Sequence, residues 1–343
     1  MTTIKDVARM ANVSASTVSR VLADSPRISA ATKRRVREVL EHLDYHPNTL
    51  ARGLVTNTTS AIGVLMPYGG NEFFENPFFA QMMSGVSEVA NENGYDIVLF
   101  TSGPDTDTID RVIRGRRVDG IFLLSSKQDD PVLKLVEQQK FPAVLLGRAP
   151  DGISVSTVNN DNVSAAYKAT EHLIRLGHKR IGFLGGASDL VVTLDRVTGY
   201  RNALRDYQLE PDAQLEVSSF FLEQGGYLGM MRLLASSDRP TAVLASDDVL
   251  AFGAMRASAE LGYHLPSELA IVGFNDIRMA EIANPSLTSV RVHMHELGSA
   301  AANMLLEHIK NSDLEPQHKT IRTELVVRNS CGASYLNTSS PLP

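Results

Sequence analysis

The segment TIKDVARMANVSASTVSRVL, residues 3–22, contains two short runs of apolar residues at helical spacing with a break at Asn12. The first run recurs at i, i+3, i+4 and i+7 and comprises Ile4, Val7, Ala8 and Ala11. Thr3 and Asp6 form a capping box before it, and Asn12 can end the helix because asparagine tolerates the left-handed conformation. The segment therefore predicts one short helix and the start of a second.

The second helix is expected to begin after Ser14 as N-cap and to bury Val18, Val21 and Leu22. Its other positions are small hydroxyl residues, one alanine and Arg20, a composition unlike that of a core helix or an ordinary surface helix. A third helix follows Ser29 and buries Val36, Val39, Leu40 and Leu43. Two short helices joined by a tight turn and braced by a third are typical of a helix-turn-helix.

Composition and charge indicate a globular protein with a basic head and an acidic body. The chain has 343 residues, of which 43% are hydrophobic, and a single cysteine, Cys331, which fits a reducing cytoplasm. No export signal or membrane-spanning segment is expected, so localisation is predicted to be cytoplasmic. Residues 1–59 hold nine Lys/Arg against five Asp/Glu, a net charge of +4, whereas the remainder has −10. This asymmetry favours a small polyanion-binding module joined to another domain.

Between the head and the body lies YHPNTLARGLVTNTTS, residues 45–60, which predicts a two-turn helix after Pro47. A helix this short is marginal in water unless something packs against it. We therefore expect a helix-turn-helix domain at 1–46 and a hinge helix with linker at 47–59.

From Ala61 onward, short apolar runs alternate with helix-length segments, which predicts βαβ units and parallel sheets. The expected fold class is α + α/β: a three-helix head with a hinge helix, then a two-lobed, doubly wound body of the periplasmic-binding-protein type. Lobe one is expected at 60–158 plus 290–320, lobe two at 159–289 plus 321–330, and a polar tail at 331–343. Ligands of such folds bind at the carboxyl ends of the strands, here in the cleft between lobes.

Three motifs, TIKDVARMANVSASTVSRVL, YHPNTLARGL and IVGFND, resemble those of bacterial transcription regulators of the lactose/galactose repressor family. The similarity covers about residues 3–330. Within the family, GRRVDGIFLLSS and LDRVTGYRNAL look most like the repressors of maltose and maltodextrin operons.

The resemblance implies that the second helix enters the major groove of DNA. Ser14 and Thr17 would contact phosphates or base edges, Ala15 and Ser16 occupy specificity positions, and Ser19 and Arg20 follow one turn later. The matching backbone-positioning sites are Thr3, Ile4, Lys5, Arg27, Ser29 and Thr32. Asn48, Ala51 and Leu54 match a hinge helix that binds the minor groove. The alternatives are a solvated charge at Arg20 and a plain linker at 47–59.

For the small-molecule effector, the resemblance implies a site that includes Phe79, Arg196 and Phe221. Asp161, Asn275 and Asp276 complete the predicted site, with Asp247 nearby. Structural alternatives are helix caps at Asp161 and Asp247, a core position for Phe79 and a surface ion pair for Arg196. Many relatives carry aspartate where Asn275 stands, and an amide both donates and accepts hydrogen bonds.

An enzyme is not expected, because the chain lacks the nucleophile elbow, the P-loop and the zinc-binding HExxH motif. No metal site, cofactor or membrane partner is expected. The predicted function is a repressor that binds a palindromic operator in double-stranded DNA as a homodimer and responds to a carbohydrate, maltose, maltodextrin or a related sugar. The alternative is a sugar-binding protein without DNA function, which would not need residues 1–59.

Overall fold

The computed structural model describes residues 2–22, 24–45, 58–66, 71–101 and 105–333. The chain divides into two compact units, residues 1–60 and 61–343. The predicted hinge-helix residues Asn48, Ala51 and Leu54 lie outside the described residues.

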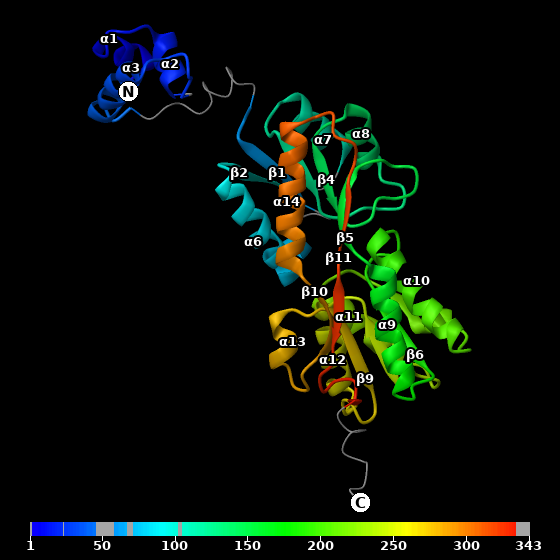
Figure 1. The fold of residues 1–343 in the computed structure, drawn as a ribbon. Helices are drawn as coiled ribbons and strands as arrows, with labels where there is room; N and C mark the ends of the chain where they lie inside the picture. Colours follow the sequence, from blue (N-terminus) through cyan, green and yellow to red (C-terminus); the bar gives the residue numbers. More distant parts are fainter. Residues whose placement is uncertain (1, 23, 46–57, 67–70, 102–104, 334–343) are drawn as a thin grey trace, which may run out of the picture. The chain divides into compact units, whose positions relative to one another are not determined.

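The first unit is the predicted three-helix head (Figure 1), with α1 (Ile4–Met10), α2 (Ala15–Leu22) and α3 (Ala30–His42). Both halves of the capping box at Thr3 are present, and Asn12 has φ of 49° after α1. The caps at Ser14 and Ser29 are also formed. The small core comprises Val7, Ala8, Ala11, Val18, Val21 and Val36, and the other residues predicted to be buried, Leu22, Val39, Leu40 and Leu43, are half-buried against it. This packing confirms the predicted helix-turn-helix.

The second unit contains two six-stranded sheets, one in each lobe. The first sheet has the order β11-β5-β4-β3-β1-β2, with β1 (Ala61–Leu65), β2 (Asp96–Phe100), β3 (Gly120–Leu123), β4 (Ala143–Leu146), β5 (Ser156–Asn160) and β11 (His318–Ile321). The second has the order β12-β10-β9-β8-β6-β7, with β6 (Ile181–Gly185), β7 (Glu216–Ser218), β8 (Ala242–Ala245), β9 (Ala270–Asn275), β10 (Thr288–Val292) and β12 (Thr323–Val326). Every pairing is parallel except that of β10 with β12.

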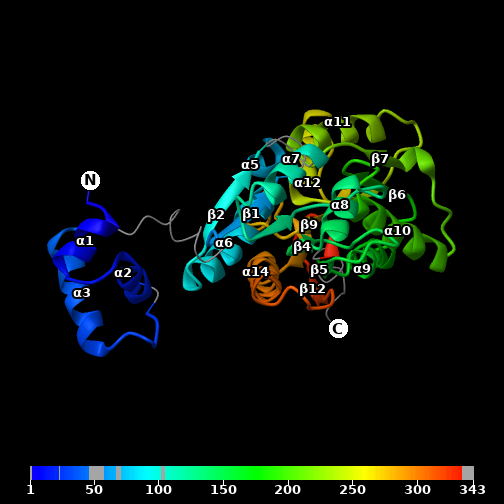
Figure 2. The same cartoon turned by 90° about the horizontal axis from the view of Figure 1, so that it is seen from above.

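Helices cover both sheets, as Figure 2 shows. In lobe one these are α5 (Asn71–Glu75), α6 (Pro77–Glu92), α7 (Thr106–Arg114), α8 (Pro131–Gln139) and α14 (Met294–Lys310). In lobe two they are α9 (Asn162–Arg175), α10 (Val191–Asp206), the short 3-10 helix Ala213–Leu215, α11 (Glu223–Leu234), α12 (Asp248–Glu260) and α13 (Arg278–Ile282). The backbones of α6 and α14 approach closely because Gly85 and Gly298 have no Cβ to collide with the facing helix. No helix among those described is long and apolar enough to cross a membrane.

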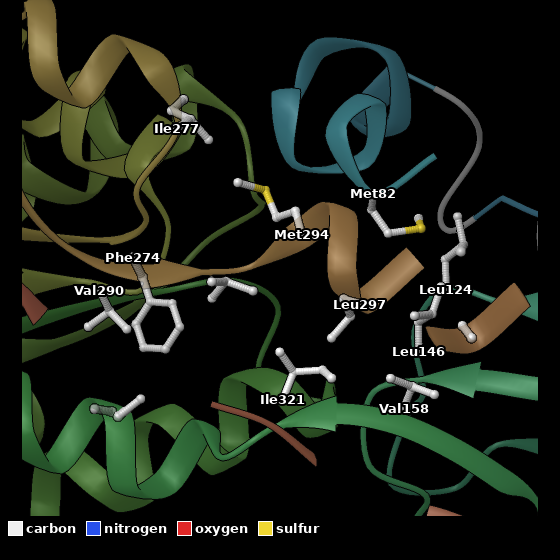
Figure 3. Packing of buried hydrophobic residues seen from close by; sticks show 14 of the residues in the cluster. Met82, Leu124, Leu146, Val158, Phe274, Ile277, Val290, Met294, Leu297 and Ile321 are labelled. Atoms are coloured by element: carbon white, nitrogen blue, oxygen red, sulfur yellow. The ribbon is translucent and has the colours of Figure 1, made fainter. Parts of the chain in front are cut away.

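One apolar cluster runs from lobe one into lobe two (Figure 3). Its labelled members are Met82, Leu124, Leu146, Val158, Phe274, Ile277, Val290, Met294, Leu297 and Ile321. Met294 and Ile321 lie next to two of the points where the chain passes between lobes. The lobes therefore share core packing at their crossings.

The crossings differ by one to three residues from those expected. β5 remains in the first sheet to Asn160, and β10 remains in the second to Val292, whereas the expected limits followed residues 158 and 289. The third crossing is at Arg322, between β11 and β12. The sequence misplaced these limits because β5 (STVNN) and β10 (TSVRV) are rich in polar residues, so no apolar run marks their ends.

The expected start of the polar tail at residue 331 is wrong. Cys331 is 1% exposed, and its sulfur accepts a hydrogen bond from Thr288 Oγ1 at 3.1 Å. Ser330 is also fully buried, and its backbone nitrogen donates to the carbonyl of Ser286. The core of lobe two therefore includes the chain as far as Cys331, because this thiol behaves as a small apolar side chain.

Candidate functional site

A cavity of about 890 Å³, including its open mouth, lies between the two lobes of the second unit. It is bounded by residues at or just past the carboxyl ends of β3, β4, β5 and β9 and by α6 and α10. The space that it encloses is about 100 Å³, smaller than the roughly 300–1,000 Å³ of typical small-molecule sites. Five apolar side chains visible in Figure 3 contribute to its wall: Met82, Leu124, Leu146, Val158 and Leu297. The polar lining residues are Asn76, Ser125, Ser126, Arg148, Asn159, Asn160, Asn162, Arg196, Asp247 and Asn275.

Arg196 is the cation at the centre of this lining. It lies in the first two turns of α10 and is 5% exposed, so the alternative of a surface ion pair does not apply. Its Nε donates to Asn162 Oδ1 at 2.9 Å, and its Nη1 donates to the carbonyl of Ser246. The guanidinium lies over the Phe274 ring, 3.7 Å from the centroid. These contacts on three sides fix its orientation.

Burial lowers the pKa of Arg196 to about 10, although the neighbouring carboxylates oppose this effect. The guanidinium remains protonated at neutral pH, because a pKa near 10 lies well above it. The cavity therefore contains a fixed positive charge with a planar set of donors, a geometry suited to holding ligand oxygen atoms.

Asp247 is both a helix cap and part of the cavity wall, so the structural alternative holds for it, and its contact with an effector stays a prediction. Its Oδ1 accepts from the backbone nitrogen of Val249 at 2.8 Å at the start of α12. Its Oδ2 accepts from Asn76 Nδ2 at 3.0 Å and from Asn275 Nδ2 at 2.9 Å. Burial raises the pKa of Asp247 to about 6, against the effect of these hydrogen bonds and of Arg196.

Asn275 ends β9, is 1% exposed and has φ of 109°, in the left-handed half of backbone space. Because its amide nitrogen donates to Asp247, its amide oxygen points elsewhere and has no partner among the described residues. A buried acceptor without a partner is costly, which favours a ligand that donates a hydrogen bond there.

Two aromatic side chains predicted from the sequence line the cavity. Phe79 stacks on Phe73 with centroids 5.2 Å apart, so it is a packing residue as well as a lining residue. Phe221 lies against Gly186, where any Cβ would overlap its ring. The absence of a side chain at Gly186 therefore leaves room for this aromatic wall.

The cavity lining does not include Asp161 or Asp276, and their predicted contact with an effector stays a prediction. Asp161 is exposed and caps α9 by accepting from the backbone nitrogen of Ser164 at 2.9 Å. Asp276 is turned away from the lining and forms ion pairs with Arg291 and Arg328, each at 2.7 Å. Both residues stabilise the elements that hold neighbouring cavity residues, Asn160 and Asn162 for Asp161 and Asn275 for Asp276.

The predicted site took only Asp161 from the motif NND, residues 159–161, and left out the asparagines on either side of it. Asn159, Asn160 and Asn162 line the cavity, and Asn162 accepts from Arg196. The run NNDN at the carboxyl end of β5 was a signal, since polar residues there face a ligand cleft. Asn76, Ser125, Ser126 and Arg148 were also missed as lining residues. Among the described residues, no three His, Cys, Asp or Glu side chains are grouped as a metal site would require.

In the first unit, α2 presents a cluster of hydroxyls at its N-terminus. Ser14 Oγ accepts from the backbone nitrogen of Thr17 at 3.1 Å and lies 2.7 Å from Ser16 Oγ and 2.8 Å from Thr17 Oγ1. Val18 and Val21 pack into the core, whereas Arg20 is exposed and has no partner among the described residues. The side chains on the face of α2 that does not pack into the core are therefore small and polar, with the positive charge of Arg20 at one end.

The other described residues predicted to contact DNA are exposed or half-buried. Thr3 and Ser29 cap α1 and α3, and Ser29 Oγ lies 2.9 Å from Thr32 Oγ1. The remaining members of the predicted set are Ile4, Lys5, Ala15, Ser19 and Arg27. Lys33 and Arg37 pair with Asp24, each at 2.9 Å. The described cations of the head that form no such pair with a carboxylate are Lys5, Arg20, Arg27, Arg34 and Arg35.

Comparison with known protein families matches both units. Residues 3–48 match the family described as bacterial regulatory proteins, lacI family, and residues 170–331 match the periplasmic binding protein-like domain. The chain is 38% identical over 300 residues to the HTH-type transcriptional regulator MalR of Streptococcus pneumoniae serotype 4, covering 84% of this chain and 91% of that protein. It is 34% identical to the HTH-type transcriptional regulator CelR of Thermobifida fusca, covering 96% and 98%.

Solved structures give the same result. A transcriptional regulator CelR–cellobiose complex superposes with a TM-score of 0.74 at 32% identity, covering 96% of this chain and 100% of that one. The lac repressor dimer bound to operator and the anti-inducer ONPF superposes with a TM-score of 0.84 at 26% identity, covering 96% and 99%. These relatives are regulators of transcription rather than enzymes, in agreement with the motif analysis. The chain belongs to the lacI family of bacterial regulatory proteins.

Proposed function

We propose that this protein is a transcriptional repressor that binds a palindromic operator as a homodimer, with its DNA affinity controlled by a small carbohydrate in the interlobe cavity. The observation that supports the effector most strongly is the buried set of Arg196, Asp247 and Asn275 in a cavity that Phe79 and Phe221 also line. A helix-turn-helix on the same chain supports DNA as the second partner.

Sugar chemistry matches this lining. A sugar hydroxyl donates one hydrogen bond and accepts others, and the cavity offers donors on Arg196 together with an unpaired acceptor on Asn275. The apolar C–H face of a pyranose packs on aromatic rings such as Phe79 and Phe221. The relatives include a regulator in complex with cellobiose and one named MalR, which supports maltose, maltodextrin or a related sugar as the effector.

In the DNA complex, α2 lies in the major groove. Arg20 contacts a guanine, Ala15 contacts a thymine methyl group, and the hydroxyls of Ser14, Ser16, Thr17 and Ser19 contact phosphates or base edges. The hinge residues Asn48, Ala51 and Leu54 bind the minor groove at the centre of the operator. In this arrangement two-fold symmetry of the dimer places the half-sites about one helical turn apart.

The alternative, a sugar-binding protein without DNA function, differs in its response to salt. The five described cations of each head that form no pair with a carboxylate give a slope of log K against log salt steeper than about −3 per protomer on duplex DNA. A protein that binds only sugar gives a slope near zero. Calorimetric titration with maltose, maltotriose, cellobiose, ribose and glucose 6-phosphate then identifies the effector class, and no heat with any of them would contradict a carbohydrate effector of this kind.

A further inference from the structure

Backbone hydrogen bonds join one loop of each lobe beside the cavity, where Ser126 and Leu190 belong to its lining. The loop after β3 contains Ser126, Lys127 and Gln128, and the loop after β6 contains Asp189 and Leu190. The backbone nitrogen of Val191 donates to the carbonyl of Ser126 at 3.0 Å, and that of Gln128 donates to the carbonyl of Asp189 at 3.1 Å. Lys127 and Leu190 form an antiparallel bridge between these bonds.

An ion pair reinforces this bridge nearby. Arg148, after β4 in lobe one, donates from Nε to both carboxylate oxygens of Asp195 at 3.2 Å and from Nη2 to Oδ1 at 2.8 Å. The Asp195 side chain, on α10 of lobe two, is only 9% exposed, whereas that of Arg148 is 45% exposed. A second pair, Lys127 with Asp189 at 2.8 Å, is exposed on both sides and contributes little.

These contacts lie in the path of a ligand. Arg196, Asp247 and Asn275 are each at most 5% exposed, so a sugar-sized molecule reaches them only when the lobes separate. The shared core at the crossings does not involve the two loops, so the lobes can separate at the mouth while remaining joined at the crossings.

We propose that Ser126–Gln128 and Asp189–Val191, together with the Arg148–Asp195 pair, form an interlobe latch. The latch holds the closed state, and its strength sets the fraction of molecules in which the cavity is open to an effector. Arg148 and Asp195 are in this respect positioning residues, which act through lobe closure. The proposal concerns closure itself, and its test needs neither DNA nor an effector, so its failure would leave the proposed function intact.

One of the two backbone hydrogen bonds of the latch can be removed without unfolding the helix that donates it. Val191 is the first residue of α10, where proline is tolerated, and the preceding Leu190 has the extended conformation (φ −76°, ψ 130°) that a following proline requires. Val191→Pro deletes the N–H that donates to Ser126 and replaces the buried valine side chain with the proline ring. The matched control is Thr106→Pro at the first residue of α7, within lobe one, where the preceding Asp105 is also extended.

The ion pair has an equally close control. Arg201 and Glu216 form a bidentate pair inside lobe two with similar exposure, 43% and 13%. Arg148→Gln removes a pair between lobes, and Arg201→Gln removes a comparable pair within one lobe.

Interlobe distance in the full-length protein measures closure directly. Spin labels are placed at the exposed positions Gln138 on α8 and Arg232 on α11, with buried Cys331 left in place, and read by double electron–electron resonance. We expect Arg148→Gln to raise the open-to-closed ratio about fivefold, Val191→Pro to raise it at least as much, and both controls to change it less than twofold. Asp195→Asn added to Arg148→Gln gives no further shift if the two residues act as a pair.

Unchanged distance distributions in both Arg148→Gln and Val191→Pro, with melting temperatures near that of the parent protein, would overturn the latch. Equal shifts in the latch variants and the controls would overturn it too, because the effect would then be general loosening of the fold.

Discussion

The titration of Asp247 predicts how the stability of this protein depends on pH. The side chain is 4% exposed and its pKa is raised to about 6, with burial as the main cause, from the ordinary value of 3.8. The folded protein therefore binds this proton more tightly than the unfolded chain does. The contribution to stability is largest below pH 3.8 and is lost as pH rises through 6.

The size of the effect follows from the two pKa values. Between pH 4.5 and pH 7.5, a group that titrates near 6 when folded and near 3.8 when unfolded loses about 2 kcal/mol of stabilisation. Asp247→Asn removes this titration. We expect the free energy of unfolding of the parent protein, minus that of Asp247→Asn, to fall by about 2 kcal/mol across this range.

Urea unfolding of both proteins at pH 4.5, 5.5, 6.5 and 7.5, with refolding checked at each pH, measures the difference. Asp161→Asn is the control, since Asp161 also caps a helix but is exposed. A difference that stays constant with pH, or rises with it, would show that Asp247 is not a buried carboxylate with a raised pKa.

Three further predictions concern the two binding sites. Arg20→Ala should weaken binding to a selected operator by at least about tenfold, measured by fluorescence anisotropy, with a much smaller loss on random duplex; equal losses on both would exclude a base contact. Arg196→Lys keeps the charge beside Asp247 but loses the fork held by Asn162 and Ser246, so calorimetry should show effector binding weakened at least about tenfold, with operator affinity in the absence of effector within threefold of the parent. Gly186→Ala should displace the Phe221 ring and weaken effector binding about tenfold, whereas Gly182→Ala, which faces Leu233, should not; the same result for both would remove Phe221 from the site.

The sequence predicted the strands that are apolar and missed those that are not. The seven apolar runs AIGVLM, YDIVLF, VDGIFLLS, FPAVLLG, RIGFLGG, TAVLAS and LAIVGF all contain strands. Six of these strands are buried at every position because helices cover both faces of the sheets, whereas β2 is a partly exposed edge strand. β7 (EVS) and β11 (HKTI) were not predicted from the sequence, because they are short edge strands with few buried residues. Their place depends on pairing with β6 and β5, which no local pattern contains.

The cavity-lining residues that belong to family motifs were predicted from the sequence. Those whose place in the lining depends on the direction in which the side chain points were not. Phe79, Arg196, Phe221 and Asn275 all line the cavity. Asp161 does not, because it turns back to cap α9, while the asparagines on either side of it face the ligand space. The ion pair of Arg148 with Asp195 on the other lobe could not be predicted from the sequence either, because Asp195 lies 47 residues further along the chain.

The central claim is that a sugar in the interlobe cavity controls binding to DNA. The direct test selects a duplex from a random library with the full-length protein, then measures its dissociation constant with and without each sugar that binds by calorimetry. The account predicts a palindromic duplex whose dissociation constant changes at least fivefold with one sugar in the parent protein and not in Arg196→Lys. A selected duplex whose affinity no bound sugar changes would contradict it.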